Sequence, residues 1–552
     1  MKSFSSKNLT RRNLFKAGTI VGAAALGTTV VSGCAPTTGQ ELSTTGDATE
    51  YAKPASGNAT LNFMKKPEPI TEFVDTKEYD IVVVGAGAAG VACALSAVEN
   101  GAKVAVLQKE LTAISQGNFC SGILLDSSDL AGVEAVTSAY MFSNHHSSRR
   151  EIVDIWAKNS GEAVTWLIDR ALEAGAQVMD VGNDAQMAVT NVNGYKLNYV
   201  TAFFGPKPYT YGDGMIALAG LAEQKGVDFF YSTPGVQLVT DEAGAVTAVV
   251  GDGPDGHILF NATKGVVLAC GDFQNDEEMC DYFVPELKHI DRKCMNRTGD
   301  GHKMGYWAGA ALSSTYSKMV HDMDAGPVAM MDQPFFLNLN EKGERFAPES
   351  IGMYVTNNYV SDEEGCGYYT QVFDADYIAH ADTFPGLVPP EGLLPYMPEE
   401  DVERAGVFPD LIGTYAADTI EELAEKLGLD PITFKASVDR YNELCEKGSD
   451  DDFGKPAAMM IPIKTPPFYG IHRHVRLSCL DGGLEVDGNL QCLNTEGEPI
   501  KGLYAIGVVG SGSSGGDNWL AGGSTGSACV GGTALGRSCT AGYVTGRMLA
   551  QQ

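Results

Sequence analysis

The sequence predicts an α/β fold in which one domain, built from both ends of the chain, is interrupted by an inserted α+β domain. Three observations support this prediction. A strand, a glycine-rich turn, a small-residue helix and a second strand follow one another between residues 80 and 110. Residues 326–470 are richer in aromatic residues and proline and poorer in glycine clusters. After Gly502 the chain returns to a buried strand, glycine-rich turns and a small-residue helix, so its last segment is expected to rejoin the first domain.

The most specific motif lies in the first of these regions. An apolar run, Ile81–Val84, leads into Gly85-Ala-Gly87-Ala-Ala-Gly90, and a second apolar run follows at Val104–Leu107. In such a βαβ unit Gly85 permits the tight turn, Gly87 lets the backbone approach a pyrophosphate, and Gly90 lets helix and strand pack closely. The helix N-terminus offers N–H groups and a positive dipole end to the phosphates. The unit therefore predicts a Rossmann-like domain that binds a dinucleotide.

One position departs from the motif. An acidic residue usually ends the second strand and accepts hydrogen bonds from the ribose hydroxyls. Here the position is Gln108, followed by Lys109. A glutamine carbonyl can still accept one hydrogen bond, but without the help of a charge. We therefore expect somewhat weaker recognition of the ribose.

The remaining elements follow from periodicity and turn residues. Apolar residues three and four apart predict a helix around Ile155–Leu167 and another over Met215–Lys225. Further strands are expected at 228–231, 236–240, 246–250 and 266–271, and further helices at 303–311, 420–427 and 431–444. The predicted organisation is a signal (1–34), a tether (35–75), the first part of the cofactor domain (76–325), a capping domain (326–470) and the C-terminal part of the cofactor domain (471–552).

The N-terminal segment is expected to be an export signal and not part of the folded domain. Arg11-Arg12 precede an apolar stretch, Ala17–Val31, that is too short to span a bilayer. This pattern is typical of a Tat signal, which exports folded proteins. Val31-Ser32-Gly33-Cys34 resembles a lipobox, so Cys34 is expected to carry a lipid anchor. The following residues, rich in Thr, Gly, Ala, Ser and Pro, are expected to form a flexible tether outside the cytoplasm.

Composition excludes some classes of function. The net charge of −31 argues against nucleic-acid binding, because phosphates would be repelled. The 12 cysteines contain no CxxC or CxxCH pair, so haem attachment and iron–sulfur clusters are unsupported. The nine histidines show no HExxH-like pairing, and no metal site is expected.

Separated motifs identify a family resemblance. From about residue 75 to the end, the chain resembles the FAD-dependent fumarate reductase/succinate dehydrogenase flavoprotein superfamily, which includes soluble fumarate reductases, urocanate reductases and 3-ketosteroid Δ1-dehydrogenases. Besides GAGAAG, the resemblance rests on VVLACGDF (266–273, where the family has VVLATGGF), TGDG (298–301), NEKGERF (340–346), PFYGI (467–471) and GLYAIGVV (502–509). The resemblance implies a Rossmann-like FAD-binding domain with an inserted α+β capping domain.

The resemblance also implies a set of FAD contacts. The pyrophosphate, ribose and flavin contacts are expected from Gly85, Gly87, Ala88, Ala89, Gly90, Gln108, Lys109, Gln116, Gly117, Ser121, Gly122, Val236, Ala269, Cys270, Gly271, Asp300, Val508, Ser524 and Thr525. The family's C-terminal GE becomes Gly507-Val508, so that carboxylate contact is missing. The 115–122 loop holds no histidine, and the FAD is therefore expected to be bound non-covalently.

The substrate site departs from the family. Fumarate reductases hold two carboxylates with arginines and histidines, and arginine pairs well with carboxylate. Here the proton-donor arginine is replaced by Met353, the clamp histidine by Cys479, and the clamp arginine by Asn518 or Trp519. The family's relay arginine falls near Asp332, and its relay glutamate falls near Ala329. A further family histidine is absent, and Lys207, Tyr209 and Tyr211 occupy its region. A neutral, aromatic and sulfur-bearing lining suits an apolar or aromatic substrate.

A tyrosine is expected to replace the lost acid. Tyr354 adjoins the position of the lost arginine, and tyrosine donors serve in the related steroid dehydrogenases. Packing within the capping domain is the alternative role for Tyr354, and Tyr211 and Tyr209 are the alternative donors. A donor needs hydrogen-bond reach to the substrate.

The predicted function is that of an exported, lipid-anchored FAD-dependent ene-reductase acting in anaerobic respiration. It would saturate an activated C=C bond of an aromatic acrylate, enone or steroid-like substrate by hydride transfer from flavin N5 and proton donation from tyrosine. Electrons are expected from a membrane quinol- or cytochrome-linked donor, because the chain has no haem domain of its own. The alternatives are a dehydrogenase of the 3-ketosteroid Δ1 type and a flavin-binding lipoprotein without turnover.

Overall fold

The computed structural model describes most of the chain beyond residue 60. The described residues are 61–552 with the exception of 116, 144–147, 181–188, 193, 205–212, 289, 293–295, 315, 322–334, 352–359, 361–366, 381–386, 405–406, 408 and 511–531.

The largest sheet carries strands from both ends of the described chain. Its main path runs β18 (Gln491–Leu493), β19 (Pro499–Ala505), β10 (Gly256–Leu268), β1 (Asp75–Val84), β2 (Val104–Leu107) and β7 (Asp228–Phe230). Strand β1 pairs in parallel with both β10 and β2, β10 with β19, and β2 with β7. Strand β9 (Val246–Gly253) pairs antiparallel with β10, and β8 (Gly235–Thr240) pairs antiparallel with β9, so both extend the sheet. The expected mixed α/β fold is confirmed in this sheet.

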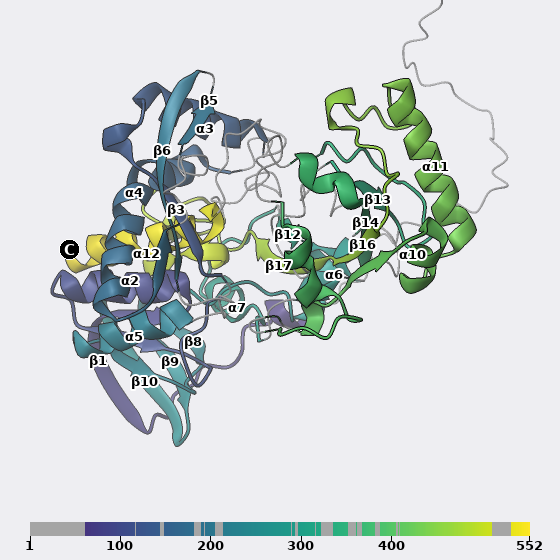
Figure 1. Cartoon of the computed structure of the whole chain (residues 1–552). Helices are drawn as coiled ribbons and strands as arrows, with labels where there is room; N and C mark the ends of the chain where they lie inside the picture. Colours follow the sequence, from purple (N-terminus) through teal and green to yellow (C-terminus); the bar gives the residue numbers. More distant parts are fainter. Residues whose placement is uncertain are drawn as a thin grey trace, which may run out of the picture. The chain divides into compact units, whose positions relative to one another are not determined.

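The core of this sheet explains why its strands are continuous apolar runs. Residues Ile81–Val84 are at most 4% exposed, and Val104–Leu107 at most 1%. Strands of a parallel sheet are covered on both faces, so every residue of the run is buried. The covering helices include α2 (Ala88–Glu99), α5 (Asp213–Gln224) and the C-terminal α12 (Thr533–Ala550), and Figure 1 shows α2 and α12 side by side.

The remaining elements form smaller units. One sheet joins β3 (Phe119–Ile123), β6 (Tyr195–Phe204), β4 (Val178–Asp180) and β5 (Val189–Val192), next to α3 (Leu130–Ser143) and α4 (Arg150–Glu173). A second joins β11 (Asp291–Arg292), β17 (Arg476–Asp481) and β12 (Ser317–His321), and short helices lie at α6 (Glu277–Phe283), α7 (Asp300–Trp307) and α9 (Pro390–Leu393). A third, antiparallel sheet has the order β13 (Leu337–Leu339), β14 (Tyr368–Phe373), β16 (Phe468–His474) and β15 (Thr414–Ala417).

The third sheet has its own apolar core, which it shares with helices α10 (Ile420–Lys426) and α11 (Pro431–Lys447). Thr419 caps α10 by accepting a hydrogen bond from the Glu422 N–H at 3.1 Å. Asp430 caps α11 in the same way, and α11 ends at Gly448, whose φ of +73° suits a glycine. These local signals explain why both helices lie close to the ranges expected from the sequence.

One expected helix begins and ends earlier than predicted. The sequence suggested a helix over 303–311, whereas α7 spans Asp300–Trp307. The helix begins early because Gly299 takes the left-handed conformation, with φ of +69°, directly before it. It ends early because Ala310 forms a β-bridge with Asn494.

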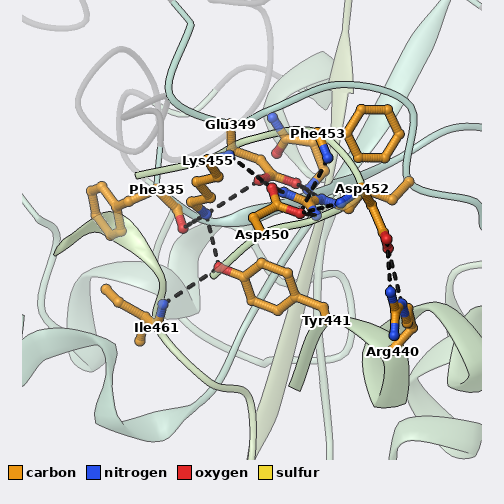
Figure 2. A network of polar contacts seen from close by, with 11 residues as sticks. Phe335, Glu349, Arg440, Tyr441, Asp450, Asp452, Phe453, Lys455 and Ile461 are labelled. Atoms are coloured by element: carbon orange, nitrogen blue, oxygen red, sulfur yellow. Dashed lines mark hydrogen bonds and ion pairs between the residues drawn. The ribbon is translucent and has the colours of Figure 1, made fainter. Parts of the chain in front are cut away.

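A buried charge cluster lies beside the third sheet (Figure 2). The Arg345 guanidinium forms paired hydrogen bonds with the carboxylates of Glu349 and Asp450, at 2.7–3.0 Å. Lys455 is fully buried, and its Nζ lies 3.2 Å from Glu349 and donates to the Phe335 carbonyl at 2.6 Å. Burial lowers the pKa of Lys455, although Glu349 opposes this shift. With two cations and two anions the cluster is neutral, as deep burial requires.

Replacing Lys455 by Met should destabilise the protein by about 3–5 kcal/mol, because the buried carboxylates of Glu349 and Asp450 would then share the single cation Arg345. Lys435→Met is the matched control, since the Lys435 side chain is 44% exposed on α11 and forms a surface pair with Asp439. Denaturant unfolding of the two variants checks this expectation. Equal unfolding midpoints would show that the Lys455 ion pair contributes nothing to stability.

Candidate functional site

The glycine turn between β1 and α2 has the shape that a dinucleotide needs. Gly85 has φ of +108°, and a methyl group placed on it would lie 2.5 Å from the Ala269 carbonyl oxygen. A methyl group on Gly90 would lie 1.9 Å from the Gly85 carbonyl oxygen. Gly87 differs, because its methyl group would meet only Ile114 O, at an ordinary 3.5 Å. Gly85 and Gly90 are therefore required by the protein's own packing, whereas Gly87 leaves room for a ligand.

The N-terminus of α2 is ready to bind an anion. Gly87 is its N-cap residue and supplies no side-chain cap, and the first turn holds no acidic residue. The first N–H groups of a helix lack partners within the helix and carry partial positive charge. Ala88, Ala89 and Gly90 provide these groups here. The turn can thus hold a pyrophosphate through its backbone alone.

Gln108 and Lys109 follow β2 at the edge of this turn. The Gln108 side chain is 7% exposed, and its Nε2 donates to the Thr112 carbonyl at 2.9 Å. Its orientation is fixed in this way, with the carbonyl oxygen Oε1 left as the acceptor for a ribose hydroxyl. Lys109 Nζ lies 2.9 Å from Asp300 Oδ2 and 3.0 Å from Thr298 Oγ1. This ion pair joins the end of β2 to the start of α7.

The turn after β10, residues 269–271, forms another part of the candidate cofactor site. The Ala269 N–H donates to the Val84 carbonyl at 2.8 Å, and Cys270 Sγ lies 3.2 Å from the same oxygen. Burial, and then the charge of Asp300, raises the pKa of Cys270 to about 12, so its thiol stays protonated. Gly271 has φ of +79° and packs against the Arg297 guanidinium.

The other predicted FAD contacts are distributed over several elements. Ser121 and Gly122 lie in β3, between α12 and α4, and a methyl group on Gly122 would lie 2.2 Å from Ser160 O. Gly117 has open space around it. Val236 lies in β8 and Val508 in the short 3₁₀ helix Gly507–Val509. Gln116, Ser524 and Thr525 lie outside the described residues.

Of the predicted substrate residues, the structure describes Cys479. It lies in β17 and is 5% exposed. Burial raises the pKa of its thiol well above the usual value, so the side chain is uncharged at neutral pH. The other predicted residues, Met353, Tyr354, Tyr209, Tyr211, Asn518 and Trp519, lie outside the described residues and stay predictions.

Four charged residues around Cys479 were missed by the sequence analysis. Asp481 pairs with Arg537 of α12 at 2.5 Å, and Asp272 lies 3.7 Å from Arg297. Burial raises the pKa of Asp272, although Arg297 and several hydrogen bonds oppose this shift. Asp272 had a signal in the sequence, because it stands where the family motif VVLATGGF has its second glycine. Arg537 had none, since only folding brings it to Asp481.

His302 of α7 contacts Gly482, the residue that directly follows β17. Its ring is 1% exposed, and Nε2 lies 3.3 Å from the Gly482 carbonyl. Burial lowers the pKa of His302 to about 4, so the ring is neutral at physiological pH. Its position in α7 and its edge-on contact with Phe273 give it a packing role.

Comparison with known proteins agrees with this geometry. The family described as FAD binding domain matches residues 80–525. A vinyl phenol reductase of Lactiplantibacillus plantarum is 30% identical over 79% of this chain and 91% of its own length. A digoxin reductase of Eggerthella lenta is 26% identical over 92% of this chain and 93% of its own length.

Solved structures show the same fold. A 3-ketosteroid-Δ4-(5α)-dehydrogenase of Rhodococcus jostii RHA1 is 22% identical, with a TM-score of 0.62 over 88% of this chain and 98% of that chain. An open conformation of a flavocytochrome c3 fumarate reductase is also 22% identical, with a TM-score of 0.64 over 87% of this chain and 79% of that chain. The glycine turn between β1 and α2 fits FAD, the cofactor that these comparisons indicate. The chain belongs to the FAD binding domain family, and it is an FAD-dependent oxidoreductase.

Proposed function

We propose that this protein is an exported reductase that saturates an activated C=C bond of a substrate other than a dicarboxylate. The observation that carries the proposal is the buried, uncharged Cys479 at the position of the family's clamp histidine. A neutral thiol cannot pair with a carboxylate, whereas it packs well against an apolar or aromatic group. The names of the relatives, vinyl phenol reductase and digoxin reductase, support a substrate outside the dicarboxylates.

Bound FAD would supply hydride transfer. The chain itself would bind the cofactor non-covalently through the α2 N-terminus, Gln108 and Lys109, and would orient the alkene beside β17. We assign proton donation to Tyr354, with Tyr211 as the alternative donor. The α+β segment 326–470 would cap the site and exclude water from it.

We further propose that the protein acts outside the cytoplasm, after Tat export, with a lipid anchor at Cys34. Within the part of the chain that the structure describes, no helix has the length and apolar character needed to cross a bilayer. A membrane quinol- or cytochrome-linked donor would deliver the electrons in anaerobic respiration. The twin arginine and the lipobox-like sequence support this location.

Gly87→Ala should weaken FAD binding by about tenfold or more, because the methyl group fits the apoprotein but occupies the space of the pyrophosphate. Flavin fluorescence titration of the apoprotein measures this change. Gly220→Ala is the control, since that helical glycine has open space around it and lies in α5. Unchanged FAD affinity in the Gly87 variant would contradict the assigned phosphate site.

Tyr354→Phe should lower the rate of alkene reduction by about a hundredfold or more while flavin content stays unchanged, because the hydroxyl proton is lost. Tyr211→Phe tests the alternative donor in the same way. Both are checked by oxidation of the reduced enzyme with substrate. Full activity of the Tyr354 variant would refute its assignment as the acid.

The function as a whole is tested by oxidation of reduced viologen by the FAD-loaded protein. The substrates should include fumarate, urocanate, cinnamates and enone steroids. We expect turnover with an aromatic or enone member and none with fumarate. Rapid fumarate turnover would show that other residues hold two carboxylates, and transfer of electrons from a saturated ketone to an artificial dye would indicate a dehydrogenase.

A further inference from the structure

We propose that the substrate carries no carboxylate beside its reactive double bond, because the arginines near β17 are already engaged by buried acids. This inference rests on the proposed function and narrows it, since aromatic acrylates would be excluded. It depends on two acid–arginine pairs close to Cys479, Asp481–Arg537 and Asp272–Arg297.

The first pair joins β17 to the C-terminal helix. Asp481 ends β17, and its Oδ1 accepts a hydrogen bond from Arg537 Nη2 at 2.5 Å. The two side chains are 7% and 5% exposed. A buried arginine bound to a carboxylate at this distance is not available to a second carboxylate unless the first is displaced.

The second pair joins β17 to the cofactor turn. Asp272 is fully buried, directly follows Gly271, and accepts the Leu480 N–H of β17 at 3.0 Å. Gln274 Nε2 donates to both Asp272 oxygens, at 3.1 and 3.0 Å, and to the Ser478 carbonyl at 3.2 Å. Arg297 lies 3.7 Å from the Asp272 carboxylate. Asp272 thus holds Leu480 directly, and Gln274, which is bound to Asp272, holds Ser478 on the other side of Cys479.

Two acids and two arginines lie near Cys479, and each of these arginines lies against one of the acids. Besides burial, Asp481 and then Asp272 raise the pKa of the Cys479 thiol, and both effects exceed the opposing effects of Arg537 and Arg297. Arg473, a further buried cation in β16, has interactions of its own. A substrate carboxylate here would lose its water and meet arginines that are already engaged by the carboxylates of Asp481 and Asp272. An uncharged substrate would meet no such cost.

A matched pair of probes tests the inference on the FAD-loaded enzyme. 4-Vinylphenol and 4-hydroxycinnamate share the ring and the alkene and differ by one carboxylate. Binding is measured by the perturbation of the flavin absorption spectrum, and reduction by oxidation of the reduced flavin. We expect 4-hydroxycinnamate to bind at least about tenfold more weakly. A matched enone pair with and without a carboxylate extends the test to non-phenolic substrates.

Asp272→Asn provides the corresponding variant, because asparagine keeps the shape and an acceptor while it removes the charge. The affinity for 4-hydroxycinnamate should rise about tenfold relative to that for 4-vinylphenol, because the ion pair between Asp272 and Arg297 is lost. Asp481→Asn should likewise raise the affinity for 4-hydroxycinnamate, because it removes the ion pair between Asp481 and Arg537. Asp439→Asn is the control, since that exposed carboxylate pairs with Lys435 on α11 and should leave both affinities unchanged.

The outcomes separate the inference from the proposed function. Equal or tighter binding of the carboxylate member in the wild-type enzyme, with reduction of its alkene, would overturn the inference and leave the function standing. Failure of every uncharged alkene to bind or to oxidise the reduced flavin would overturn both. Should Asp272→Asn fail to fold, the wild-type comparison and Asp481→Asn still decide the question.

Discussion

The structure depends on the close approach of backbone segments around the β1–α2 turn. Gly85 lies against Ala269 at the end of β10, and Gly90 lies against Gly85 itself. On the other side of α2, a methyl group on Gly542 or Gly546 of α12 would lie 2.2 Å from the carbonyl oxygen of Ala89 or Cys93. Glycine thus lets strand, turn and two helices touch without side chains between them. This packing shapes the turn between β1 and α2 that is expected to hold the cofactor.

Charge pairing is the second constraint, and it acts in an acidic protein with a net charge of −31. The buried charges described above occur with opposite partners: Lys455 and Arg345 with Glu349 and Asp450, and Arg537 with Asp481. Burial penalises an isolated charge far more than a pair. The excess acid therefore belongs on the surface, whereas interior cations are held by interior acids.

Local patterns made the cofactor turn and the helices α10 and α11 predictable. The glycine turn needs only a strand, a defined spacing and a helix, all within about thirty residues, and the helix caps at Thr419 and Asp430 are equally local. The paired charges were not predictable, because Asp481 and Arg537 are 56 residues apart and Arg345 and Asp450 are 105 apart. No spacing rule links such positions; their proximity is a result of tertiary packing. The proton donor Tyr354 lies outside the described residues and stays a prediction.

The cofactor part and the substrate part of the site differ in how freely their residues can vary between relatives. In the proposed function the cofactor would be held mainly by backbone groups, which tolerate few alternatives, whereas the alkene would be held by side chains, which can vary between relatives with different substrates. Asp272 connects the two parts, because it follows the cofactor turn and its carboxylate holds β17 at Leu480. A glycine at this position could not anchor the strand, and a carboxylate brings negative charge to the neighbourhood of Cys479. Anchoring of the strand and choice of substrate charge are therefore consequences of the same side chain.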